Sequence, residues 1–173
     1  MKLLIIGMLG AGKSTLAYHL AKKHNLPLLK IDEVSRDKVT GAYYPLAQQY
    51  KMLDDFVLNN ENWIAEGCQK YLYERLKPTL VVYLKVSRFK AMWRFTKRFF
   101  QAKKLIGKQI DPALPVQAYH YRKPTLKKIL QWDADNKIIR REIETYLSSG
   151  DKYYMTISSK KAISKLYHIL DGK

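Results

Sequence analysis

The stretch Gly7-Met8-Leu9-Gly10-Ala11-Gly12-Lys13-Ser14-Thr15 fits the pattern G-x-x-x-x-G-K-[ST] and follows the apolar run at residues 3–6. A buried strand, a glycine-rich turn and a helix start, in that order, place backbone N–H groups and the positive end of a helix dipole around an anion. Lys13 would then reach the terminal phosphates and Ser14 would hold Mg²⁺. The alternative, a glycine-rich turn that binds nothing, is disfavoured by the flanking strand and helix signals.

This motif therefore predicts a site for ATP or another nucleoside triphosphate. The predicted nucleotide-binding residues are Gly7, Gly10, Ala11, Gly12, Lys13, Ser14 and Thr15.

The composition is that of an ordinary globular protein. A chain of 173 residues, 47% of them hydrophobic, fits one domain with a single core. The single Cys68 cannot form an intramolecular disulfide, which fits a reducing compartment. Glycines and Lys13 interrupt the first apolar run, which disfavours a signal peptide, and no stretch is apolar enough to span a membrane. We expect a cytoplasmic protein without a membrane partner.

The charge is strongly basic and unevenly distributed. The chain has 32 Lys and Arg against 15 Asp and Glu, a net charge of +17. Residues 85–128 carry 13 basic residues and one acidic residue, Asp111. Such a block could contact nucleic acid, or it could be the phosphate-closing part of a kinase surrounded by solvated lysines. Composition alone leaves both open.

The hydrophobic pattern predicts five strands that alternate with helices. Such an alternation is typical of a parallel sheet with helices on both faces. The predicted strands are residues 3–6, 28–31, 63–65 (ending at Glu66-Gly67), 80–84 and 153–157, and the predicted helices are 13–24, 45–58, 88–102, 124–147 and 162–170. Residues 103–122, which contain Gly107, Pro112 and Pro115, are predicted to be irregular.

Two of the predicted helices carry an apolar stripe that we expect to pack against the core. In residues 45–58 the stripe consists of Leu46, Tyr50, Leu53 and Val57, and in residues 88–102 of Phe89, Trp93, Thr96 and Phe100. The opposite face of the second helix is basic and includes Arg94 and Arg98, one turn apart.

Taken together, these features resemble the adenylate-kinase-like branch of the P-loop kinases, and within it the FlaR-like group known as DNA topology modulation proteins. The resemblance covers roughly the first hundred residues, and more loosely the last strand and helix. It is carried by residues 7–15, Asp32, residues 63–67, Arg75-Leu76, Arg88, Arg94, Lys97 and Arg98. It implies a three-layer α/β fold of one domain, residues 1–173, with a basic lid-like insertion at about 88–122.

The resemblance also implies roles for individual residues. The aspartate after the second strand, here Asp32, would face the acceptor, the acid and glycine after the third strand would support Mg²⁺, and the arginines of the next helix and lid would close on the phosphates. This sequence has Glu66 where aspartate is more usual, and Cys68-Gln69 where the family usually has Asn-Tyr. The longer glutamate can still hold a metal-bound water, whereas the second difference leaves the acceptor open.

The candidate residues form three groups. Lys13, Asp32, Arg94 and Arg98 are the predicted catalytic residues, Ser14 and Glu66 the predicted metal ligands, and Asp32, Arg36, Gly67 and Arg88 the predicted substrate-binding residues. An aspartate at a strand end can also be a helix cap or turn residue, and Arg36 and Arg88 can also be solvated surface arginines.

These predictions favour an ATP- and Mg²⁺-dependent phosphotransferase acting on a small-molecule acceptor, a nucleoside or nucleotide. One alternative is a nucleotide-binding accessory protein that contacts nucleic acid through residues 85–128 with little turnover, and another is a nucleoside triphosphatase without an acceptor. A protein that recognises a specific DNA sequence should have a motif that enters a groove of the DNA, and this amino-acid sequence has no such motif. The sequence leaves the acceptor, the base preference and the oligomeric state open.

Overall fold

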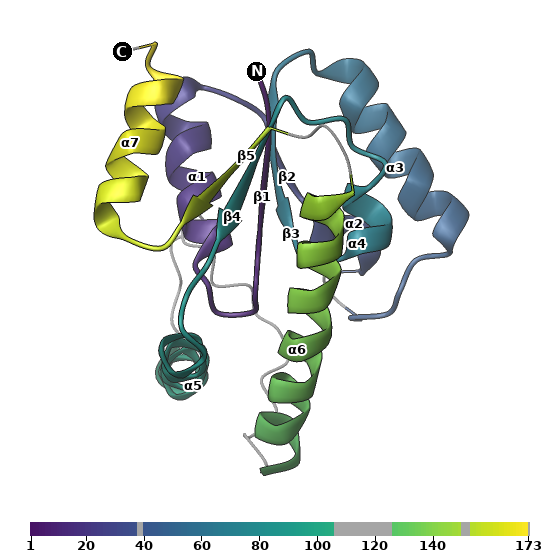
Figure 1. Cartoon of the computed structure of the whole chain (residues 1–173). Coiled ribbons are helices and arrows are strands. Elements are labelled where there is room, and N and C mark those ends of the chain that lie inside the picture. Colours follow the sequence, from purple (N-terminus) through teal and green to yellow (C-terminus); the bar gives the residue numbers. More distant parts are fainter. Residues whose placement is uncertain (38–39, 106–125, 150–152, 173) are drawn as a thin grey trace.

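A parallel sheet of five strands, in the order β2-β3-β1-β4-β5, forms the centre of the molecule (Figure 1). The computed structural model describes residues 1–37, 40–105, 126–149 and 153–172, without the side chains of residues 95 and 98–130. The strands are β1 (Lys2–Gly7), β2 (Leu28–Lys30), β3 (Trp63–Gly67), β4 (Leu80–Leu84) and β5 (Tyr154–Ile157). This confirms the predicted three-layer α/β fold.

Helices cover both faces of the sheet (Figure 1). The helices are α1 (Lys13–His24), α2 (Ile31–Ser35), α3 (Leu46–Asn59), α4 (Lys70–Tyr73), α5 (Arg88–Leu105), α6 (Leu126–Ser148) and α7 (Lys160–Leu170). Helices α1 and α7 pack on one face, and α2, α3, α4 and α6 on the other. Helix α5 lies at the carboxyl end of the sheet, after β4 (Figure 1).

Strand β1 shows why the central strands are continuous apolar runs. Leu4 and Ile6 point into the core on the α3 and α6 side, whereas Leu3 and Ile5 point into the core on the α1 and α7 side. All four are fully buried. A strand covered on both faces has no polar side, so its sequence does not alternate.

Most predicted boundaries lie within two residues of the observed ones, with four differences. Ile31 begins α2 instead of ending a strand, and Glu66 and Gly67 belong to β3. The short helices α2 and α4 were not predicted, because helices of five and four residues are too short for a helical period to show. Residues 103–105 continue α5, and the rest of the segment predicted to be irregular, 106–122, lies outside the described residues.

The expected packing of two apolar stripes was partly wrong. In α3 Leu53 is buried, but Leu46 is exposed, because it is the first residue of the helix and precedes the turns that contact the sheet. In α5 the error is larger, since Phe89 is 77% and Trp93 69% exposed.

The face of α5 that packs inward carries a small side chain, that of Ala91. Ala91 is fully buried, and a Cβ atom added to Gly10 would lie only 2.6 Å from the Ala91 carbonyl oxygen. A helix that approaches a loop this closely must present a small side chain there. Phe89 and Trp93, each two positions from Ala91, therefore point away from this contact.

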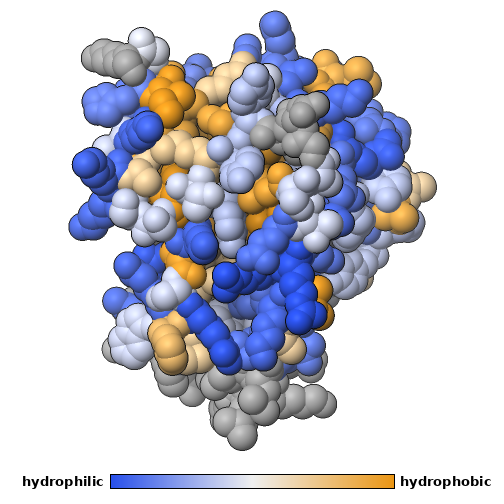
Figure 2. All heavy atoms as spheres, viewed as in Figure 1, coloured by the Kyte–Doolittle hydropathy of each residue, from blue (hydrophilic) through white to orange (hydrophobic). Residues whose placement is uncertain are grey.

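The length of the helices and the distribution of apolar residues bear on whether the chain spans a membrane. None of the helices within the described residues is both long and apolar enough to cross a bilayer. Figure 2 shows hydrophilic residues over most of the face viewed, with apolar residues in separate patches.

The packing of α3 can be tested with two leucines of the same helix. Leu53 is 1% exposed in the core and Leu58 is 83% exposed. We expect Leu53→Ala to lower the free energy of unfolding by about 2–5 kcal/mol, because it removes buried contacts and leaves a cavity. Leu58→Ala should change it by less than about 0.5 kcal/mol. Urea denaturation measures both, and equal effects would contradict the placement of α3.

Candidate functional site

The loop between β1 and α1 lies at the carboxyl end of the sheet, between the ends of β3 and β4. Ile6 pairs with Gly67 of β3, and Gly7 pairs with Leu84 of β4. Open α/β sheets bind their ligands outside the carboxyl ends of the strands. The predicted nucleotide-binding residues therefore occupy the edge where this fold places its chemistry.

The loop takes a conformation that requires glycine at two positions. Gly10 has a φ of +84° and Gly12, the residue before α1, a φ of +101°, both in the left-handed region. No side chain among the described ones caps α1 at this end. The N–H groups of the first turn of α1 have no carbonyl four residues earlier to bind, so they can bind an anion.

Lys13 lies inside this loop. Its side chain is buried, and its Nζ donates hydrogen bonds to the carbonyl oxygens of Gly7 (2.9 Å) and Met8 (3.2 Å). The hydrogen bonds of the ammonium group among the described residues thus go to backbone carbonyl oxygens of the loop. A phosphate bound to the same loop would offer Lys13 a full negative charge in their place.

The two predicted metal ligands are brought together. Glu66, at the end of β3, is buried and accepts a hydrogen bond from the Ser14 hydroxyl. Burial raises the pKa of the Glu66 carboxyl, and the nearby Lys13 ammonium and the Ser14 hydrogen bond only partly oppose it. A hydroxyl and a carboxylate are oxygen donors of the kind that Mg²⁺ prefers, so these residues fit that ion.

Asp32 is held by a residue that the sequence did not assign to the site. The Gln69 side-chain amide donates a hydrogen bond to Asp32 Oδ1, and its Nε2 lies 3.5 Å from Ser35 Oγ. The Asp32 charge also acts on the carboxyl of Glu66. The end of β2 and the segment after β3 are therefore joined, with both carboxylates on the same side of the loop.

Cys68 has no role in this arrangement as a nucleophile. Burial raises the pKa of its thiol to about 11, which keeps it protonated at neutral pH.

Of the predicted arginines, Arg94 reaches the loop. Its Nη1 donates a hydrogen bond to the Ala11 carbonyl oxygen at 3.0 Å. Arg98 lies one turn later on α5, but its side chain is outside the described ones. The order of the sheet, which places β4 beside β1, explains how α5 comes to meet the loop.

Arg88 and Arg36 contact other side chains. Arg88 Nε is 2.5 Å from Asp133 Oδ1 of α6. Arg36 stacks on the Tyr43 ring at 4.1 Å and donates a hydrogen bond to its hydroxyl. Arg36 lies on the same side of the sheet edge as Asp32, since the charges of both act on the Tyr71 phenol.

A second contact to the loop was missed. The Leu9 N–H donates to Asn136 Oδ1 of α6 at 2.8 Å. The signal was an asparagine on the buried face of α6, in line with Trp132, Ile139 and Ile143. A polar residue in an apolar stripe indicates a buried partner, but the stripe does not identify it.

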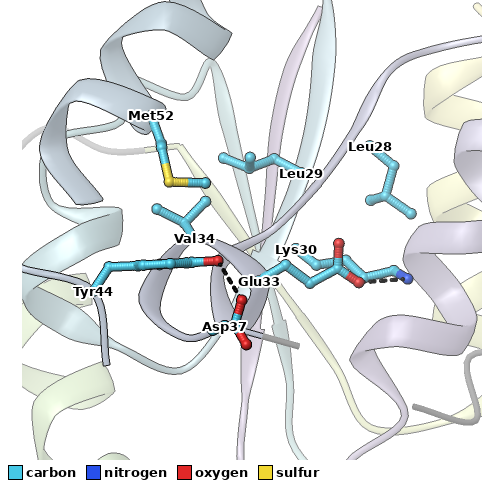
Figure 3. Close-up of a pocket in the computed structure, with 8 residues that line it drawn as sticks. All are labelled: Leu28, Leu29, Lys30, Glu33, Val34, Asp37, Tyr44 and Met52. Carbon is cyan, nitrogen blue, oxygen red and sulfur yellow. Dashed lines mark hydrogen bonds and ion pairs between the residues drawn. The ribbon is translucent and has the colours of Figure 1, made fainter. Parts of the chain in front are cut away.

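The cavity in Figure 3 is separate from these residues. It has a volume of about 350 Å³ and lies between β2, α2 and α3. It contains an ion pair between Lys30 and Glu33 (3.2 Å) and a hydrogen bond from the Tyr44 hydroxyl to Asp37 (3.1 Å). None of its lining residues belongs to the phosphate loop.

Comparison with known proteins gives similarity in structure and none in sequence. No protein-family model matches the chain, and no curated protein matches it. The structure is similar to that of a deoxyadenosine kinase from M. mycoides with bound dATP, with a TM-score of 0.55 and 20% identity over 99% of this chain and 100% of that chain. The chain therefore has the same fold as this enzyme.

Two further structures agree with this result. The same deoxyadenosine kinase with the products dCMP and a flexible dCDP matches with a TM-score of 0.54 and 20% identity over all of both chains. An uncharacterised protein from Eubacterium ventriosum ATCC 27560 matches with a TM-score of 0.53 and 16% identity over 99% of this chain and 98% of that chain. At these identities the likeness shows the fold.

Lys13→Ala should weaken nucleotide binding and leave the fold intact. The variant removes a charged donor from the phosphates, worth about 1.5–3 kcal/mol, or roughly 10- to 100-fold in affinity. The loop should persist, because its glycines are unchanged and the Met8 carbonyl keeps its hydrogen bond from the Ala11 N–H. Titration with Mg·ADP, with a circular dichroism spectrum as the check on folding, measures this. The exposed Lys22→Ala of the same helix is the control, and equal affinities for the two variants would contradict the assignment.

Because the pKa of Glu66 is raised, we expect the free energy of unfolding to depend on pH through this carboxyl. Its carboxyl is easier to protonate in the folded protein than at the ordinary pKa of 4.5, so it costs no stability below that pH and becomes destabilising as the pH rises. Glu66→Gln stays neutral at every pH. We therefore expect the stability of Glu66→Gln relative to wild type to increase as the pH rises above 4.5, and then to level off.

Urea denaturation in EDTA, without nucleotide, at several pH values measures this difference. Glu61→Gln changes an exposed glutamate just before β3, and its difference from wild type should stay flat. A pH-independent difference for Glu66→Gln would show that burial does not control this carboxyl.

Proposed function

We propose that the protein is a kinase that transfers the γ-phosphoryl group of ATP to a hydroxyl group of a nucleoside or nucleotide. The observation that carries this proposal is the arrangement at one edge of the sheet. Lys13 is held inside the phosphate loop, the Ser14 hydroxyl is bound to Glu66, and Asp32 lies close enough to act on the same carboxyl. The residues that we assign to the triphosphate, the metal and the acceptor thus adjoin one another.

Each of these side chains has a task in phosphoryl transfer. Lys13 and the N–H groups of the loop would bind the phosphates, and Ser14 and Glu66 would hold the metal. When bound there, Mg²⁺ supplies positive charge to the phosphate oxygens. Arg94 exchanges its Ala11 carbonyl partner for the transferred group, whose outer oxygens carry negative charge in the transition state.

Asp32 acts on the acceptor. Its carboxylate orients the acceptor hydroxyl and takes its proton as the new O–P bond forms and the bond to the leaving ADP breaks. Gln69 keeps that carboxylate in place through the hydrogen bond to Oδ1. The function of Gln69 is therefore to position a catalytic group.

The similar structures support a nucleoside acceptor. The M. mycoides enzyme is a deoxyadenosine kinase, and its structures contain dATP, dCTP, or dCMP with dCDP. Deoxynucleosides are for this reason the first acceptors to test. We also propose that the protein resembles the FlaR-like group within these kinases. Use of Mg²⁺ and a location in the cytoplasm are further parts of this proposal.

The described part of the basic block supports a role in closing on phosphate more than contact with nucleic acid. Arg94 points to the loop and Arg88 is paired with Asp133, so neither is free for a polyanion in this structure. Non-specific contact through the lysines of residues 85–128 stays a prediction.

Labelled ATP with a panel of deoxynucleosides, ribonucleosides, nucleoside monophosphates and sugars tests the proposed function. We expect label to pass to at least one nucleoside or nucleotide. Transfer only to water would support a nucleoside triphosphatase, and labelling of no product would contradict a kinase.

Asp32→Asn should keep ATP binding and lose transfer to the acceptor that this panel identifies. The carboxylate is needed at the hydroxyl and not at the triphosphate, and loss of a general base costs about 10²- to 10⁴-fold in rate. The control is Glu33→Gln, which changes the next residue of α2, a side chain that lines the separate cavity in Figure 3. A normal transfer rate in Asp32→Asn would show that Asp32 has only a structural role in α2.

A further inference from the structure

Asn136 is a buried polar residue that connects α6 to the phosphate loop. It is 4% exposed, and its Oδ1 accepts the hydrogen bond from the Leu9 N–H across 127 residues of sequence. Trp132, one turn earlier on α6, packs with Met8 and Ala91. The amide thus meets the loop through a specific polar contact beside an apolar cluster.

The orientation of this amide follows from its partner. A backbone N–H needs an acceptor, and only the oxygen of an asparagine amide accepts. Since Oδ1 faces the Leu9 N–H, the amide nitrogen Nδ2 occupies the other position of the amide group. It has no hydrogen-bond partner within the described residues. A buried donor without a partner is unfavourable, so a leucine of similar size would suit this position better if packing were its only task.

The hydrogen bond to Asn136 is one of several contacts to residues 8–11 of the loop. Gly10, next to Leu9, packs closely on the Ala91 carbonyl of α5. Within the loop, the Ala11 N–H donates a hydrogen bond to the Met8 carbonyl oxygen. Met8 is packed by Trp132. The main chain of residues 8–11 is therefore held from both sides, by α5 and by α6, before any phosphate is bound.

We propose that Asn136 is a positioning residue for the phosphate loop, which fixes the Leu9 N–H so that the loop is already in the shape that binds nucleotide phosphates. Preorganisation of this kind increases affinity because less ordering remains to be done on binding. The inference rests on the proposed function of the loop as a nucleotide site. It assigns Asn136 no contact with the nucleotide.

The variant pair Asn136→Leu and Ala134→Leu tests this. Both introduce leucine on α6, but Ala134 is exposed on the opposite side from Asn136. In Asn136→Leu we expect faster hydrogen exchange of the Leu9 amide and an increase of about 3- to 10-fold in the Kd for Mg·ADP. The KM for the acceptor should stay within a factor of about 2, because Asn136 belongs to the phosphate side. Ala134→Leu should match wild type in all three.

Asn136→Asp provides a second variant that keeps an oxygen acceptor of the same shape. Only the Leu9 amide is compared in this variant, since the added charge would itself repel phosphate. Its hydrogen exchange should remain close to that of wild type, and this comparison decides the matter if Asn136→Leu does not fold.

Three results would overturn the inference. They are an unchanged Leu9 exchange rate in Asn136→Leu, an equal Kd for Mg·ADP in Asn136→Leu and Ala134→Leu, and a loss of Leu9 protection in Asn136→Asp. A wild-type protein that binds no Mg·ADP would instead overturn the proposed function, and the inference with it, which distinguishes the two failures.

Discussion

The register of β1 with its two neighbours determines where every side chain of the candidate site lies. Ile5 pairs with Glu66, and Glu66 pairs in turn with Lys30 of β2, directly before the helix that carries Asp32. On the other side Gly7 pairs with Leu84, after which α5 begins. A slip of one residue would turn Glu66 to the opposite face of the sheet.

The same edge of the sheet concentrates charge that the fold must stabilise. Lys13 and Glu66 are both buried, and a buried charge is costly unless a partner or hydrogen bonds compensate it. Lys13 has two carbonyl oxygens, while Glu66 has the Ser14 hydroxyl and the nearby ammonium, yet burial still raises the pKa of Glu66. A site with incomplete compensation gains most from a ligand that brings both phosphate and metal.

The sequence was sufficient for the phosphate loop and the five strands, because each is encoded within a short stretch. It was insufficient where a contact joins distant parts of the chain. Gln69 holds Asp32 across 37 residues and Asn136 holds Leu9 across 127, and no local pattern encodes such a pair. The outward orientation of Phe89 has the same origin. Helical spacing identified its stripe, but the close approach at Gly10 decided which face of α5 turns inward.

The most direct test of the account is to follow every backbone amide of the wild-type protein by NMR during titration with Mg·ATP, at an ionic strength of about 0.15 M to screen non-specific charge attraction. A phosphate site at this loop should give saturable shifts centred on Gly10, Gly12, Lys13 and Ser14, with smaller ones at Glu66. Shifts confined to the exposed lysines of α7, or shifts that disappear at this ionic strength, would contradict it.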